Sequence, residues 1–233
     1  MVIVGILVLC LLAGLLMLSL KSKPKAPAAT PAVTEVINLE ELRTKAGSGD
    51  AEAQMKLGAA YAGGDGLKRD CAQAAIWYRK AADQGQARAQ IALGELYESG
   101  QGVASDAAEA VKWYRRAAEQ GDPAGQYSLA NMYLLGTGVP MDDAEALKWY
   151  RQSADQGYAL AIFHLGMRYK KGQGVVADPV EAYKWLTLAA ARGVAEATEI
   201  RDEIKGSMTR DQIAEGKRRA EAFVARKPGA PTP

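Results

Sequence analysis

Cysteine, histidine and phenylalanine are scarce in this sequence. Its 233 residues include two cysteines, one histidine and two phenylalanines. Cys10 and Cys71 are too few, and too differently placed, to form a disulfide framework. A zinc site needs more nitrogen and sulfur ligands than one histidine and one thiol supply. We therefore expect no metal site and no cofactor in this protein.

An excess of charge of either sign is also missing. The chain carries 29 lysines and arginines against 27 aspartates and glutamates, a formal net charge of +2. Residues 49–192 hold sixteen basic and seventeen acidic side chains. No basic field is available to bind phosphates, so we expect no nucleic-acid partner. With 48% hydrophobic and 24% charged residues, the composition is that of a folded protein.

Long apolar runs are limited to the N-terminus. Residues 2–20 contain no charged side chain, and Lys21, Lys23 and Lys25 follow directly. A helix of 19 residues, rising about 1.5 Å per residue, nearly spans the ~30 Å hydrocarbon core of a bilayer. The sequence therefore predicts a transmembrane anchor over residues 1–20. The Pro-, Ala- and Lys-rich residues 21–35 are predicted to form a semi-extended stalk.

A cleaved export signal is the competing interpretation of this apolar run. Such a signal has a basic residue before the apolar core and a small-x-small cleavage site close behind it. Here no basic side chain precedes the run, and the nearest such triplet, residues 26–28, lies beyond the three lysines. A lipoprotein signal is disfavoured because Leu9, and not a small residue, precedes Cys10. An uncleaved anchor therefore fits better.

From Gly49 onward the chain repeats every 36 residues, and four units align without gaps. The predicted units are residues 49–84, 85–120, 121–156 and 157–192. Aligned positions include tryptophans, leucines, tyrosines and aspartates: Trp77, Trp113, Trp149, Trp185; Leu57, Leu93, Leu129, Leu165; Tyr61, Tyr97, Tyr133, Tyr169; and Asp70, Asp106, Asp142, Asp178. Four units with this many shared positions predict a helical-repeat solenoid.

Each unit is predicted to contain two helices. The first, helix A, runs from about the third to the fourteenth position, and its apolar residues form one stripe. A Gly-x-Gly segment such as 100–102 then ends the helix and turns the chain. The second, helix B, opens with an aspartate N-cap, followed three residues later by Glu109, Glu145 or Glu181 in three units. This spacing predicts a capping box.

The two ends of the array are predicted to be caps. Residues 36–48 contain an Asn38–Glu41 capping pattern and a short helix over about 39–46. Residues 193–226 form a degenerate repeat, in which 193–204 continue as helix A. A charge-rich last helix is expected from Thr209 to about Ala225, since a solenoid needs a more polar final element. We expect the tail, 227–233, to be disordered.

The repeat unit resembles the Sel-one-like repeat (SLR), a relative of the tetratricopeptide repeat. The second unit matches at residues 89–97 (AQIALGELY), 100–103 (GQGV) and 113–118 (WYRRAA). The departures are Ala130 for the helix-A glycine, Leu67 for the loop valine and Leu186 for the tyrosine after tryptophan. The resemblance implies an all-α, right-handed superhelical solenoid that serves as an adaptor or scaffold in protein complexes.

Residues with catalytic potential have simpler interpretations. His164 aligns with Lys56, Ala92 and Ser128, so we expect a solvated histidine on the exposed side of helix A. Cys71 falls in the first turn of helix B, where a thiol pKa can be lowered, but no histidine accompanies it. The Gly-x-Gly loops follow no strand and are not nucleotide fingerprints. We therefore predict that the protein is not an enzyme.

A binding surface is predicted on helix A, by analogy with tetratricopeptide-type solenoids. We define the helix-A face as the seventh, eleventh and fourteenth positions of the units. These are Met55, Ala59, Ala62; Ile91, Glu95, Glu98; Tyr127, Asn131, Leu134; and Phe163, Met167, Lys170. Aromatic and methionine side chains beside polar anchors suit a peptide groove. The predicted partner-binding residues are therefore those of units three and four: Tyr127, Asn131, Leu134, Phe163, Met167 and Lys170.

Alternatives to a protein- or peptide-binding adaptor remain open from the sequence. The seventh-position residues equally suit packing between repeats. The whole array also suits a self-assembling scaffold, or a periplasmic envelope sensor of peptide or glycan fragments. Lysines directly after the apolar run favour repeats that face the cytoplasm in a single-pass membrane protein. Export of the repeats to the periplasm is the other orientation.

Overall fold

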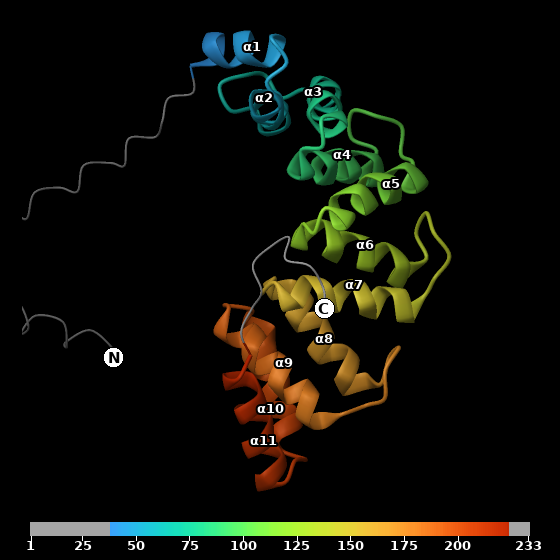
Figure 1. The fold of residues 1–233 in the computed structure, drawn as a ribbon, viewed down its shortest axis with the longest axis vertical. Helices are drawn as coiled ribbons and strands as arrows, with labels where there is room; N and C mark the ends of the chain where they lie inside the picture. Colours follow the sequence, from blue (N-terminus) through green and yellow to red (C-terminus); the bar gives the residue numbers. More distant parts are fainter. Residues whose placement is uncertain (1–37, 224–233) are drawn as a thin grey trace, which may run out of the picture. The chain divides into compact units, whose positions relative to one another are not determined.

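The computed structural model describes residues 38–223, and all secondary structure in this part of the chain is α-helical. Helices follow one another along the array in chain order (Figure 1). Their bounds are α1 Leu39–Gly47, α2 Ala51–Gly63, α3 Cys71–Asp83, α4 Ala87–Ser99, α5 Ala107–Glu119, α6 Pro123–Leu135, α7 Asp143–Asp155, α8 Ala159–Lys171, α9 Pro179–Ala191, α10 Ala195–Lys205 and α11 Arg210–Glu221. The predicted all-α solenoid of helix pairs is confirmed.

Several predicted segments lie outside the described residues: the anchor 1–20, the stalk 21–35 and the tail 227–233. Among residues 38–223, no helix combines the length and apolar character needed to cross a bilayer. The predicted N-terminal cap is described from Asn38 onward. It contains α1, whose bounds lie within one residue of the expected helix.

Helix A starts and stops where the repeat pattern predicts. In each unit it begins at the third position and runs for 13 residues, as α2, α4, α6 and α8. Each of these helices ends at a glycine in the left-handed conformation, such as Gly100 at φ 70°. A residue with a Cβ disfavours that conformation, so glycine defines the helix end. The aligned leucine at the ninth position is buried in all four units.

Helix B begins directly after its aspartate N-cap, in α3, α5, α7 and α9. The carboxylate of Asp106, for example, accepts the backbone N–H of Glu109 at 3.0 Å. The predicted capping box is wrong in these helices, because the glutamate does not reach back to the N-cap. Glu109 instead pairs with Lys112, with Nζ 2.7 Å from Oε2, and Glu145 and Glu181 also pair with a lysine three residues later.

Glycine at the tenth position allows helix A and helix B to approach closely. A Cβ on Gly94 would lie 2.6 Å from the Tyr114 ring, and one on Gly58 would lie equally close to Tyr78. The tyrosine rings of helix B are consequently buried, with Tyr114 only 2% exposed. This packing directs the tyrosine hydroxyls toward side chains of helix A, as the hydrogen bond from Tyr114 to Glu98 shows.

Glutamines link successive units through the buried interior. Gln90 is 3% exposed, and its Nε2 donates to the carbonyl oxygen of Ala82 at 3.1 Å. Its Oε1 accepts from Nε2 of Gln120 at 2.8 Å. Gln54 and Gln126 occupy the same position in the first and third units and donate in the same way. Because a buried amide without partners is costly, these bonds fix the register of each unit on the next.

The C-terminal cap differs in one boundary from the sequence prediction. Thr209 starts the last helix as expected, and it forms a reciprocal capping box with Gln212 at 3.2 and 2.8 Å. The last helix, α11, ends at Glu221 and not near Ala225. Phe223 lies beyond its end and packs edge-on against Trp185, with ring centroids 5.4 Å apart. The chain leaves the helix because this contact places Phe223 on α9.

Candidate functional site

The six predicted partner-binding residues lie on two helices of the helix-A face. Tyr127, Asn131 and Leu134 belong to α6, and the other three belong to α8. All six side chains are half-buried. Tyr127, Leu134 and Phe163 also pack against the core that α6–α11 share. Part of each of these three side chains therefore packs between units, and the remainder is exposed on the helix-A face.

The two polar anchors already have partners within the chain. The Oδ1 atom of Asn131 accepts a hydrogen bond from the Tyr150 hydroxyl of α7. Lys170 pairs with Glu203 of α10, with Nζ 2.6 Å from Oε2. The Asn131 amide thus offers its N–H groups, but not its oxygen, to a ligand. Lys170 would have to release Glu203 before binding an acidic group.

Tyr127 is the centre of an aromatic cluster that joins the third and fourth units. Its ring lies 5.3 Å from the ring of Tyr158 and 5.9 Å from that of Tyr150, measured between centroids. Its hydroxyl is 3.3 Å from Nε2 of His164. The imidazole stacks on Tyr150 at 5.2 Å with nearly parallel planes.

The expected solvated position of His164 is therefore wrong. Tyr127 and Tyr150 of the preceding unit cover the imidazole, and this burial, with the charge of Arg168, lowers the pKa of His164. Arg168 is itself 3% exposed, and its Nη1 lies 2.6 Å from Oδ1 of Asp143. Burial likewise raises the pKa of Tyr150. At neutral pH His164 is accordingly an uncharged group in this cluster.

The second unit contributes two carboxylates to the helix-A face that the predicted set omits. Glu98 accepts a hydrogen bond from the Tyr114 hydroxyl at 2.7 Å. The Glu95 carboxylate makes no hydrogen bond and no ion pair within residues 38–223. Partial desolvation by the surrounding side chains, and then the charge of Glu98, raise the pKa of Glu95. The sequence indicates that these two carboxylates lack an ion pair within their helix, because neither glutamate has a basic residue three or four positions away on α4.

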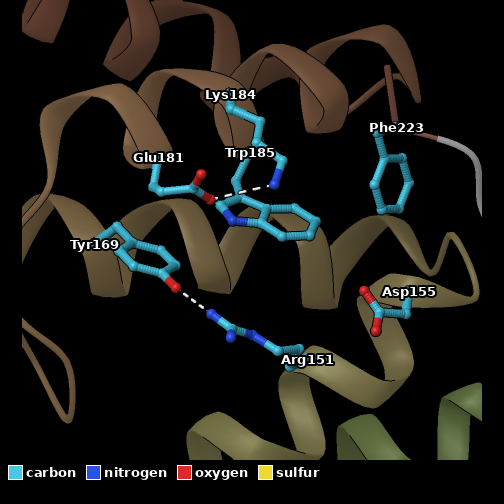
Figure 2. Close-up of a pocket in the computed structure, with 7 residues that line it drawn as sticks. All are labelled: Arg151, Asp155, Tyr169, Glu181, Lys184, Trp185 and Phe223. Carbon is cyan, nitrogen blue, oxygen red and sulfur yellow. Dashed lines mark hydrogen bonds and ion pairs between the residues drawn. The ribbon is translucent and has the colours of Figure 1, made fainter. Parts of the chain in front are cut away.

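Apart from the helix-A face, a hollow lies between α7, α8 and α9 (Figure 2). Its volume is about 380 Å³. Figure 2 shows Trp185 between Phe223 and the head group of Glu181, the Lys184 ammonium over the Trp185 ring, and Arg151 reaching the Tyr169 hydroxyl below. Sequence reasoning missed this hollow because Phe223 has no counterpart in the repeats.

Two of the four charged side chains that line this hollow, Glu181 and Lys184, are paired with each other. Glu181 binds Lys184 at 3.2 Å and Arg219 at 2.8 Å. Lys184 also lies over the Trp185 ring, with Nζ 4.2 Å from the centroid. The indole Nε1 of Trp185 is buried without a hydrogen-bond partner, as in Trp113 and Trp149. A ligand here would have to compete with these internal pairs, so the helix-A face is the better candidate.

Catalytic and metal-binding groups do not converge in the described part of the chain. Cys71 is a half-buried free thiol at the start of α3, and its Sγ lies 3.9 Å from Oε1 of Gln101. Residues 38–223 contain no group of three or more histidine, cysteine, aspartate or glutamate side chains placed to hold a metal ion. The arrangement that remains is a face of tyrosine, apolar and carboxylate side chains, which suits binding.

Comparisons with known proteins match the repeat array. The family model for the Sel1 repeat matches residues 51–86, 87–122, 123–158 and 159–194. Each match begins two residues after the unit boundary predicted from the glycines, at the first residue of helix A. Repeats of this family generally mediate protein–protein interaction.

Solved structures show the same fold. The structure of c5321, a protective antigen of uropathogenic Escherichia coli strains with an SLR fold, matches with a TM-score of 0.72 and 37% identity. That match covers 79% of this chain and 41% of c5321. A Sel1 repeat protein from Oxalobacter formigenes matches with a TM-score of 0.67 and 32% identity, covering 80% of this chain and 79% of the other.

One curated relative shares a shorter stretch. The secretory immunoglobulin A-binding protein EsiB of Escherichia coli O6:H1 is 47% identical over 45 residues. This stretch is 19% of the present chain and 9% of EsiB, so the match covers a small part of that protein. The family model, in contrast, matches more than half of the chain, in four consecutive repeats. The chain therefore belongs to the Sel1 repeat family.

Proposed function

We propose that this protein is a membrane-anchored adaptor that binds a protein or peptide segment along the helix-A face of its repeats, without catalysing a reaction. The observation that carries the proposal is the helix-A face itself. On it Glu95, Glu98, Tyr127 and Met167 are at least partly open to solvent. Family membership supports a protein partner, because Sel1 repeats generally mediate such interactions.

A contact between the helices A of two consecutive units supports the helix-A face as the concave side of the array. Helices α4 and α6 contact each other directly, although α5 lies between them in the chain. On the inner side of a curved array, the facing helices of consecutive units approach one another. A right-handed superhelix, as the family resemblance implies, would place this face in a groove.

The membrane part of the proposal rests on the N-terminal sequence. Residues 2–20 carry no charge, and Lys21, Lys23 and Lys25 follow. Positive residues beside a span tend to stay in the cytoplasm, so we propose a single-pass protein whose repeats face the cytoplasm. A phosphatase that is active only after export, fused behind residue 233, tests this orientation. Low activity in intact cells is expected, whereas high activity would establish periplasmic repeats.

The name of the relative EsiB describes binding of another protein, secretory immunoglobulin A. The shared stretch of 45 residues does not carry that activity over to this chain. It supports the coarser proposal that the ligand is a protein surface or a peptide segment and not a small metabolite.

Peptide binding tests the proposed function. Peptides of about twelve residues, selected from a random display library on the purified full chain, are titrated against variants by fluorescence anisotropy. Asn131→Asp keeps the acceptor for Tyr150 but removes the amide donors, and Phe163→Ala removes an aromatic wall. Each is expected to weaken binding about tenfold, the effect of one central contact.

Ile76→Ala is the matched control, because Ile76 is 47% exposed on helix B of the first unit. Its effect on peptide affinity should be small. Circular dichroism of each variant checks that the helices remain intact. Unchanged affinity in both helix-A variants would show that the peptide does not bind at the helix-A face. Failure to select any peptide would contradict the proposed function itself.

A further inference from the structure

The imidazole of His164 lies at the junction between the third and fourth units, beside residues of the helix-A face. Its Nε2 is 3.3 Å from the Tyr127 hydroxyl, and its ring stacks on Tyr150 with centroids 5.2 Å apart. Phe163 lies edge-on to the same ring, with centroids 5.8 Å apart. The Tyr150 hydroxyl in turn donates to Asn131. The imidazole therefore touches two of the six predicted partner-binding residues and supports a third through Tyr150.

This junction is particular to the half of the array that we predict to bind the partner. The residues equivalent to His164 are Lys56, Ala92 and Ser128, so the other units stack without an imidazole at this position. Apart from the pair of Trp185 and Phe223, every aromatic ring contact among residues 38–223 includes Tyr127 or His164. Stacking of the repeats alone therefore does not account for this histidine.

The groups around the imidazole give a proton on it no counter-charge. Tyr127 of α6 and Tyr150 of α7 cover the ring, and Arg168 lies one turn later on α8. Arg168 pairs with Asp143 at the start of α7, and it is the one charged group of the described residues whose charge acts on the ring. Burial, and then this positive charge, lower the pKa of His164.

A bound segment on the helix-A face would strengthen this effect. His164 and Tyr127 are half-buried in the free protein. A peptide that covers Tyr127 and Phe163 would also remove water from the imidazole between them, which raises the cost of a charge on its ring. Partner binding and proton binding therefore oppose each other, and by linkage each weakens the other by the same factor.

From this junction we propose that His164 is a positioning residue for the partner segment and that its protonation in mild acid releases the partner. In its uncharged form the imidazole joins Tyr127 of the third unit and Phe163 of the fourth unit into one aromatic surface. The inference rests on the proposed function and adds a regulation of the same helix-A face.

The single histidine of the chain allows a direct test by NMR, because no other imidazole of the protein overlaps its signals. The pH titration of the ring protons is recorded on the untagged full chain, free and saturated with a library-selected peptide that contains no histidine. The pKa of His164 should be lower in the complex than in the free chain. An equal or higher pKa in the complex would overturn the inference and leave the proposed function standing.

Peptide affinity over the same pH range tests the release itself. Binding to the wild type should weaken about fivefold between about pH 7.5 and about pH 5 through His164. His164→Gln should bind about threefold more weakly at pH 7.5, since glutamine does not stack on Tyr150, but should lose much less affinity in acid. Glu95, whose pKa is raised by burial, titrates in both proteins, so the difference between the two profiles reports His164. Parallel profiles would overturn the inference.

Ile76→His is the control, because it adds an exposed imidazole on helix B of the first unit, away from the helix-A face. Its affinity profile should match that of the wild type. A further loss in acid as large as the loss through His164 would mean that any added positive charge weakens binding, and would overturn the inference. Circular dichroism at each pH checks that the helices are intact. Failure to select any peptide would contradict the proposed function and this inference with it.

Discussion

His164 shows how a single side chain acquires its properties from neighbouring units. Tyr127 of α6 and Tyr150 of α7 cover its ring, and Arg168 of α8, paired with Asp143, adds a positive charge nearby. Both burial and this charge disfavour the imidazolium, so the folded-state pKa lies below its ordinary value of 6.5. The unfolded chain, in contrast, takes up a proton near that ordinary value.

The sign of this shift predicts a loss of stability in mild acid. The contribution of His164 is fully present above pH 6.5 and is lost as the pH falls from there toward the lower folded-state pKa. In urea unfolding, the free energy of unfolding of the wild type should therefore decline more between about pH 7.5 and about pH 5 than that of His164→Gln. Glutamine keeps a partner for Tyr127 but does not titrate. Parallel pH profiles of the two proteins would show that His164 is not buried as described.

At the scale of elements, the second glycine of each Gly-x-Gly loop stacks one unit on the next. Gly102 has φ 73°, and a Cβ there would lie 2.2 Å from the carbonyl carbon of Cys71 in the preceding unit. Gly138 approaches Ala107 in the same way. Gly85 has φ 88° but no atom within 4 Å of a Cβ. Gly85 is therefore needed only for its backbone conformation, whereas Gly102 is needed both for its conformation and for its close approach to the preceding unit.

Alanine substitutions at these positions should differ accordingly. Gly85→Ala strains the backbone alone and should cost about 1 kcal/mol of unfolding free energy. Gly102→Ala adds a clash with main-chain atoms and should cost roughly 3 kcal/mol or more. Urea unfolding followed by tryptophan fluorescence measures both values. Equal costs would mean that the loop does not need the close approach to Cys71.

Helix boundaries were predictable because local chemistry determines them. Asp70, Asp106 and their equivalents cap helix B, and left-handed glycines end helix A, so both limits are present in each repeat. The absence of reciprocal capping boxes in helix B was not predictable from spacing alone. Each N3 glutamate also has a lysine three residues later, and the ion pair forms instead. The end of α11 depends on the contact of Phe223 with Trp185, which lies far away in the sequence.

The candidate site was predictable only in part. The repeat register correctly places Tyr127, Asn131 and Phe163 on helix A. Their partners come from other helices, so the sequence did not show that Tyr150 occupies the Asn131 oxygen. The selection of aromatic residues also passed over Glu95, whose pKa is raised by partial desolvation and by the charge of Glu98.

For the molecule as a whole, function and stability depend on the same stacked units. Consecutive helices from α1 to α10 pack on one another, and the polar helix α11 packs on α9. In such arrays a surface built from several units exists only while the units remain stacked. The helix-A face satisfies this description, since Glu95 and Tyr127 come from different repeats. Binding should therefore be sensitive to changes that loosen the stacking.

Site-specific photocrosslinking in cells tests the central claim most directly. A photoreactive residue is placed at Leu134 or Met167 on the helix-A face, and at Ile76 or Lys148 on exposed positions of helix B. The proposed adaptor should crosslink the same protein partner from Leu134 and Met167 and little of it from Ile76 and Lys148. Crosslinks that form mainly from Ile76 and Lys148, or only between copies of this chain, would contradict a partner-binding helix-A face.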